Sequence, residues 1–231
     1  MIRNFLKRLK LRLLPSVKAR EKIEIPKANV MLNDSYLDRV EFRYILWLDR
    51  IYQKISHVPG HIVELGVARG RNAIIFSHLI TMNGDDEVRK YYGFDTFNGF
   101  TNEDIIQDPH LQCNRWKDIS KAFVENRLNN LGFRRITSFV EGDIAKTTPE
   151  FIDQNPNFRA ALLYVDCNAY RAAIAGMNAF KNNMSPGGII CIDEKQQGGE
   201  TRALIDFCKS QGVKYQKDMS PFSVPAYTII P

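Results

Sequence analysis

The sequence predicts an α/β fold, with a doubly wound, mostly parallel seven-stranded sheet, helices on both faces and an N-terminal helical extension. Short apolar segments alternate with amphipathic ones along residues 37–231, which is typical of strand–helix–strand units. The apolar segments lack the polar–apolar alternation of a sheet with one wet face, so helices should cover both sides.

Seven segments are predicted to be strands, and most of them are short apolar runs between turn-forming residues. In chain order they are 61–66, 90–95, 135–143, 160–166, 188–194, 213–218 and 226–230. The last two are expected to form a closing pair.

Six segments have the apolar spacing of amphipathic helices. They are 37–55, 71–80, 119–133, 148–154, 170–184 and 199–212. Gly132 suits a left-handed helix end, and Pro149 suits the start of a helix. The polar stretch 96–118 is predicted to be a loop.

Residues 1–22 are predicted to be a basic amphipathic arm in front of a single domain at 23–231. The arm has eight Lys and Arg residues and one acid, which leaves a charge of −1 for the domain, so the domain is not a nucleic-acid binder. Phe5, Leu6, Leu9 and Leu13 would share one helical face. The arm is therefore either a solvated or partner-packed extension or a contact for an anionic membrane surface.

The four cysteines include no CxxC pair and none with His at zinc spacing, which indicates a reduced, cytoplasmic protein. No apolar run approaches the ~18 residues that span a membrane. Helix 37–55 would pack either on its own domain or on a second subunit, so the sequence leaves open whether the protein forms a homo-oligomer.

Acidic residues follow all of the first five predicted strands. Because parallel strands end at the same rim, where open α/β sheets bind ligands, we expect these acids to converge. They are Glu64 before the Gly66–Gly70 turn, then Asp95, Glu141 with Asp143, Asp166, and Asp193 with Glu194.

The glycine turn argues for a nucleoside ligand without phosphate. Gly66 and Gly70 enclose three residues, which fits neither GxGxxG nor GxxxxGK[ST]. S-adenosylmethionine has a ribose, an adenine and a cationic amino acid, and no phosphate. Glu64 suits its amino group, and Asp95 has two acceptor oxygens for the ribose hydroxyls.

Five segments resemble the macrocin O-methyltransferase family. They are "VELGVARGRNAIIF", "GFDTFNGF", "FVEGDIAKTTPEF", "LLYVDCNAY" and "SPGGIICIDE", and the resemblance runs from about residue 36 to about residue 210. It implies an S-adenosylmethionine-dependent enzyme that methylates sugar hydroxyls, often with bound magnesium.

The resemblance also implies roles for single residues. The cofactor-binding positions are Glu64, Gly66, Gly70, Asp95 and Asp143, the last of these beside the adenine. Asp166, Asp193 and Glu194 would hold Mg²⁺ or another divalent cation, and three carboxylates suit such a hard ion. Asp166 and Asn168 would be the catalytic positions.

Two positions depart from the family's pattern. Asn168 stands where the family has an aspartate that acts as the general base, and an amide cannot take a proton at pH 7. Asp193 and Glu194 are followed by Lys195, where the family reads D-D-Y. Asn168 would then position a substrate oxygen, and the base would come from elsewhere, for example from His110 in the 96–118 loop.

Two other functions stay open from the sequence. One is a non-catalytic relative that binds the cofactor or a partner as a scaffold, which the loss of the acid at Asn168 favours. The other is a metal-dependent catechol-type methyltransferase, which an aromatic pocket would favour.

Overall fold

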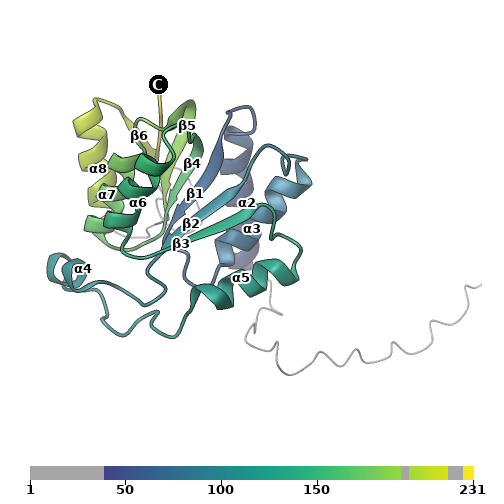
Figure 1. Ribbon diagram of the computed structural model, residues 1–231. Helices are drawn as coiled ribbons and strands as arrows, with labels where there is room; N and C mark the ends of the chain where they lie inside the picture. Colours follow the sequence, from purple (N-terminus) through teal and green to yellow (C-terminus); the bar gives the residue numbers. More distant parts are fainter. Residues whose placement is uncertain (1–38, 194–197, 218–225) are drawn as a thin grey trace, which may run out of the picture. The chain divides into compact units, whose positions relative to one another are not determined.

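A computed structural model describes residues 39–193, 198–217 and 226–231, and within them seven strands form one sheet. The strand order is β3-β2-β1-β4-β5-β7-β6 (Figure 1). The strands are β1 (His61–Leu65), β2 (Tyr91–Asp95), β3 (Thr137–Glu141), β4 (Ala160–Val165), β5 (Met184–Ile192), β6 (Tyr215–Lys217) and β7 (Ala226–Ile229). The predicted fold class is confirmed.

The first five strands are parallel, and the chain reverses its direction of travel across the sheet between β3 and β4. β1 therefore has β2 on one side and β4 on the other. β7 pairs antiparallel with both β5 and β6, so the expected closing pair is present. A reversal of this kind creates a crevice at the carboxyl ends of β1 and β4, where ligands of open α/β sheets bind.

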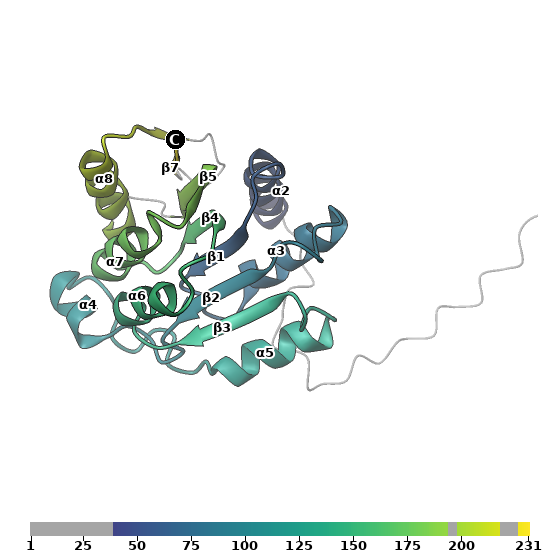
Figure 2. The ribbon, with the colours of Figure 1, turned by 45° about the horizontal axis from the view of Figure 1, so that its top comes forward.

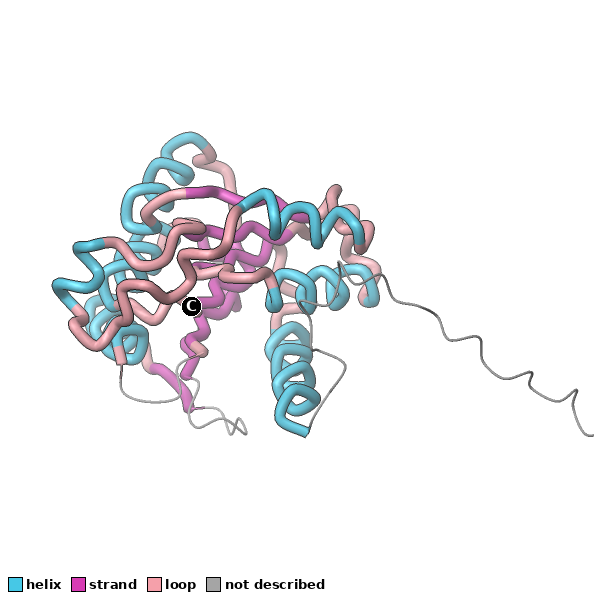
Figure 3. Tube along the Cα trace, turned by 90° about the horizontal axis from the view of Figure 1, so that it is seen from below, coloured by secondary structure: helices cyan, strands magenta, loops and turns pink. Residues whose placement is uncertain are grey.

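Helices cover both faces of the sheet, as Figures 2 and 3 show. One face is packed by α2 (Arg39–Lys54), α3 (Arg71–Met82) and α5 (Lys121–Asn130), and the other by α6 (Ile144–Gln154), α7 (Tyr170–Phe180) and α8 (Gly199–Gln211). Successive residues of β4 alternate between the two apolar clusters: Leu162 and Tyr164 join the first, Leu163 and Val165 the second. All four are buried, which explains why the strand sequence lacks alternation.

The structure differs from the predicted elements in three places. The 96–118 stretch contains a short helix, α4 (Asn102–Gln107). Thr101 caps it, because its hydroxyl accepts from the N–H of Asp104 (3.1 Å) while Asp104 accepts from the N–H of Thr101 (3.2 Å). α6 begins at Ile144 rather than at 148, so Pro149 lies inside it. β5 begins at Met184, which the sequence places at the end of helix 170–184, and α7 ends at Phe180 instead.

The predicted arm at 1–22 lies outside the described residues. Residues 39–231 form one compact unit by themselves. No helix in the described ranges is long and apolar enough to cross a membrane.

Candidate active site

Apart from Glu194, which lies outside the described residues, the predicted strand-end acids lie along one rim, because the strands that precede them are parallel and in register. Glu64 lies within β1, and Asp95 ends β2. Asp166 follows β4, where its N–H donates to Leu65, and Asp193 follows β5, where its N–H donates to Val165. These backbone bonds join the ends of β1, β4 and β5 directly.

The glycine turn after β1 depends on residues that lack a side chain. Gly66 has φ 90°, and a Cβ there would lie 2.2 Å from the carbonyl oxygen of Asp166. Gly70 caps α3 with φ 78°, and a Cβ there would lie 2.8 Å from a methyl carbon of Val124. Only glycine permits both the left-handed backbone and these close approaches.

Asp95 holds two loops together through three backbone N–H groups. One carboxylate oxygen accepts from Val67 (2.7 Å) and Ala68 (2.8 Å), and the other accepts from Phe97 (2.7 Å). Ala68 and Phe97 have φ 46° and 49°, a left-handed conformation that costs free energy for residues with a Cβ. The carboxylate compensates for this cost, so Asp95 shapes the turn in which a ribose would lie. Its predicted contact with the ribose stays a prediction.

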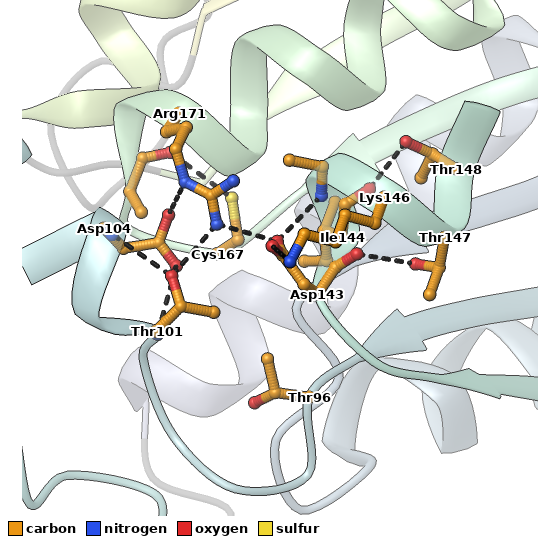
Figure 4. Close-up of polar contacts among 12 residues, drawn as sticks. Thr96, Thr101, Asp104, Asp143, Ile144, Lys146, Thr147, Thr148, Cys167 and Arg171 are labelled. Carbon is orange, nitrogen blue, oxygen red and sulfur yellow. Dashed lines mark hydrogen bonds and ion pairs between the residues drawn. The ribbon is translucent and has the colours of Figure 1, made fainter. Parts of the chain in front are cut away.

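Asp143 caps α6 and is bound by an arginine. Its Oδ1 accepts from the N–H of Ala145 (3.1 Å) and from the guanidinium of Arg171 (2.8 Å). Lys146 lies 3.8 Å from its other oxygen. Figure 4 shows Arg171 between Asp143 and the pair Thr101 and Asp104. The contact of Asp143 with the adenine stays a prediction.

Glu64 is fully buried, and neutral side chains donate to both of its oxygens. Asn72 donates to one (2.8 Å) and the Tyr91 hydroxyl to the other. Burial raises the pKa of Glu64 to about 8, although both hydrogen bonds act in the opposite direction. Asn72 also donates to Asp166 (3.1 Å) and accepts from the Tyr44 hydroxyl (3.0 Å). Asn72 therefore links the ends of β1 and β4 to α2.

Asp166 and Asp193 form a pair of carboxyl groups in contact. Burial and then the charge of Asp193 raise the pKa of Asp166 well above its usual value, and the charges of Glu200 and Glu64 add to this effect. The Tyr44 hydroxyl lies 2.7 Å from that of Tyr164 and 3.4 Å from an oxygen of Asp193. Carboxyl groups this close share a proton or a cation, because two bare charges would repel each other.

Asn168 lies in the loop between β4 and α7 with φ 60°. Asparagine tolerates this left-handed conformation better than most residues do. Its N–H donates to the carboxylate of Glu200, a side chain that is 1% exposed on the first turn of α8. A Cβ at Gly199 would lie 2.9 Å from the Asn168 carbonyl oxygen, so α8 begins directly against this loop. The predicted contact of Asn168 with a substrate is untested.

A metal ion fits the donor chemistry here, although the described residues do not form a complete site. Among them, no group of three or more His, Cys, Asp or Glu side chains is arranged to hold a metal. Asp166 and Asp193 are two of the three predicted ligands, whereas Glu194 and the neighbouring Lys195 lie outside the described residues. The carboxylate oxygens of Asp166 and Asp193 are donors of the kind that a hard cation prefers.

Sequence reasoning missed four residues of this site. Tyr44 has the spacing of a core residue in helix 37–55, and Asn72 has no signal besides its place after the glycine turn. Arg171 and Glu200 follow the predicted site segments by one to six residues in the chain. Their contacts join elements that are far apart in sequence, so periodicity could not reveal them.

Comparisons with known proteins point to one family. A model of the macrocin O-methyltransferase (TylF) family matches residues 30–220. A mycinamicin III 3''-O-methyltransferase from Micromonospora griseorubida is 29% identical in an alignment 146 positions long, which covers 59% of this chain and 56% of that protein. The match thus spans little more than half the length of this relative.

Solved structures share the fold. A structure of the calicheamicin methyltransferase CalS11 has a TM-score of 0.73 at 26% identity, covering 84% of this chain and 80% of its own. The O-methyltransferase NovP has a TM-score of 0.71 at 17% identity, covering 82% and 80%. The architecture is that of class I, Rossmann-like methyltransferases.

Proposed function

Because this chain belongs to the macrocin O-methyltransferase (TylF) family, we propose that it transfers a methyl group from S-adenosylmethionine to a hydroxyl of a sugar or sugar-bearing small molecule. The observation that carries the proposal is the position of Gly66 against Asp166, which joins the glycine turn to the acidic pair of β4 and β5. A donor site and an acceptor site would thereby share one rim. The names of the mycinamicin and calicheamicin relatives support a glycoside acceptor.

The residues around the turn would bind and orient the cofactor. Bound S-adenosylmethionine supplies an electrophilic methyl group on a sulfonium. The acceptor oxygen would take the methyl group, S-adenosylhomocysteine would be left, and the hydroxyl proton would pass to water, since Asn168 cannot accept it. Glu64, Gly66, Gly70, Asp95 and Asp143 are the proposed binding positions, and their role is alignment, which dominates reactions of this kind.

The acidic pair would organise the acceptor side. We assign Asp166 and Asp193, together with Glu194, to a divalent cation such as Mg²⁺. Such a cation would lower the pKa of an acceptor hydroxyl. Asn168 would hold an acceptor oxygen by a hydrogen bond, since its amide cannot accept the proton.

Titration calorimetry with Mg²⁺ tests this cation site. Wild-type protein should bind Mg²⁺, and Asp166→Asn should lose this binding while keeping its affinity for S-adenosylhomocysteine. Equal Mg²⁺ affinity in both proteins would remove the cation from the proposal.

A methyl-release assay tests the acceptor. S-adenosylmethionine is offered with a panel of glycosides and a panel of catechols, with and without Mg²⁺. Turnover of glycosides supports the proposal, and turnover of catechols alone would make this a catechol-type enzyme. Cofactor binding without turnover of any acceptor would favour a scaffold, the reading that Asn168 supports.

The cellular setting belongs to the same proposal. We place the protein in the cytoplasm, with a small-molecule acceptor and no nucleic-acid partner. The charge of residues 1–22 supports contact of the arm with an anionic membrane, and a homo-oligomer would be compatible with the exposed Phe42 and Leu46 on α2.

A further inference from the structure

Arg171 binds three side chains from two other segments of the rim. It is the second residue of α7, directly after the loop that contains Asp166 and Asn168. Its guanidinium donates to Asp143 Oδ1 (2.8 Å), to Thr101 Oγ1 (2.9 Å) and to Asp104 Oδ1 (3.0 Å) (Figure 4). The planar group therefore joins the segments that follow β2, β3 and β4.

Each partner of Arg171 also fixes the start of a helix. Asp143 caps α6, on the side of the rim proposed for the cofactor. Thr101 and Asp104 form the reciprocal cap of α4, inside the long segment 96–118. The side chains of Asp143 and Asp104 are only 12% and 6% exposed, so solvent competes weakly for these ion pairs.

The segment around α4 has a second anchor that does not involve Asp143. Asp108, whose side chain is 2% exposed, accepts from the N–H of Tyr170 (2.7 Å) and from the guanidinium of Arg202. The Arg171 anchor thus connects α4 to the loop after β3. The Asp108 anchor connects the same segment only to α7 and α8. This difference separates a specific role of Arg171 from general support of the segment.

We propose that Arg171 is a positioning residue that couples the cofactor side of the rim to the segment around α4. The proposal rests on the proposed function, in which Asp143 borders the cofactor. Residues 96–118 follow β2 on the same rim and include His110, the candidate base named from the sequence. A guanidinium has a rigid fork of donors, so a shift of Asp143 that moves the guanidinium also changes its hydrogen-bond geometry with Thr101 and Asp104. Binding of the cofactor would order the loop after β3 and, through Arg171, would also order α4. The segment around α4 would therefore become ordered only when the cofactor is bound.

Hydrogen exchange of the full-length protein tests this coupling without an acceptor. In wild type, S-adenosylhomocysteine should slow amide exchange at residues 101–108 by about tenfold. In Arg171→Met this slowing should disappear, and the Kd for S-adenosylhomocysteine in calorimetry should rise by about fivefold to twentyfold. Arg171→Lys keeps the charge but lacks the planar fork of donors. Its slowing of exchange and its Kd should lie between those of wild type and Arg171→Met.

Arg202→Met is the matched control, because it weakens the Asp108 anchor and leaves the bonds of Arg171 in place. It should speed exchange at 101–108 with and without S-adenosylhomocysteine, while the ratio of the two rates and the Kd stay within about twofold of wild type. Should Arg171→Met not fold, Asp104→Asn removes the ion pair to α4 alone and should abolish the slowing by itself.

Three results would overturn the coupling. One is that both Arg171 variants retain the wild-type slowing and Kd. Another is that S-adenosylhomocysteine binds wild type without slowing exchange at 101–108. The third, wild-type protein that binds no S-adenosylhomocysteine, would also overturn the proposed function, whereas failure to methylate glycosides would affect only that function.

Discussion

Glu64 illustrates at the scale of one residue how burial sets chemistry. It has no exposed surface, and its partners Asn72 and Tyr91 carry no charge. Burial raises its pKa to about 8, so at neutral pH it keeps a proton in the folded protein that it loses in the unfolded chain. Its folded pKa is raised, and its contribution to stability is therefore full below the unfolded pKa of 4.5 and is lost as the pH rises towards 8.

Glu64→Gln should flatten this dependence. Over pH 5–8, the free energy of unfolding of wild type should fall relative to that of the variant by up to about 1.4 kcal/mol per pH unit. The amide stays neutral and keeps one acceptor oxygen for the hydrogen bonds. Urea denaturation of both proteins at several pH values measures the difference, and parallel curves would show that Glu64 ionises normally.

Gly66→Ala should be strongly destabilising. Its Cβ would lie 2.2 Å from a backbone oxygen, on a backbone with φ 90°. Gly84→Ala is the control, since Gly84 has φ 73° but nothing lies within 4 Å of its Cβ position. The control should cost about 1–2 kcal/mol for the left-handed backbone, and Gly66→Ala at least about 2 kcal/mol more. Equal losses in thermal denaturation would mean that β1 and β4 can separate at no cost.

At the scale of elements, the loops after β1 and β2 are one unit because Asp95 binds both. Its carboxylate accepts from Val67 and Ala68 in the first loop and from Phe97 in the second. Local sequence rules treat these loops as separate turns. Their joint conformation follows from a side chain that contacts residues 27 and 28 positions earlier.

Asp95→Ala should therefore lower both stability and cofactor affinity. We expect a loss of about 2–4 kcal/mol in the free energy of unfolding, since three hydrogen bonds to a charged acceptor disappear, and a loss of about 1.5–3 kcal/mol in binding. Glu141→Ala removes the exposed acid paired in register with Asp95 and should change neither quantity. Denaturation and calorimetry with S-adenosylhomocysteine report the two separately. Intact stability with lost binding would restrict Asp95 to the ligand contact.

At the scale of the whole molecule, the sequence predicts the strands of the sheet well and the side-chain contacts at its rim poorly. Apolar runs predicted the five parallel strands and the two covered faces, because burial on both sides requires apolar residues at nearly every strand position. The cap of α4 was missed because a six-residue helix has too few turns to show a period. The strand-end acids were placed on one rim, but their pairing with Tyr44, Asn72 and Glu200 depends on tertiary contacts.

Removal of residues 1–22 should leave the domain intact. Residues 39–231 form a compact unit, and the arm carries a net charge of +7 against −1 for the rest of the chain. The shortened protein should unfold within about 1 kcal/mol of wild type and bind S-adenosylhomocysteine equally well. Flotation with anionic vesicles should retain the full chain and not the shortened one. An insoluble product would place the arm in the core or in an obligate interface.

The contact between Gly66 and the carbonyl of Asp166 has a consequence for engineering. A hinge between the glycine turn after β1 and the acidic residues after β4 would have to break the backbone hydrogen bonds that join these two strands. These two parts of the site should therefore move together. Attempts to redirect the enzyme to a new acceptor should leave residues 66 and 166 untouched. Libraries are better concentrated at exposed positions of the 96–118 segment, away from Thr101, Asp104 and Asp108, because those three side chains hold α4 in place.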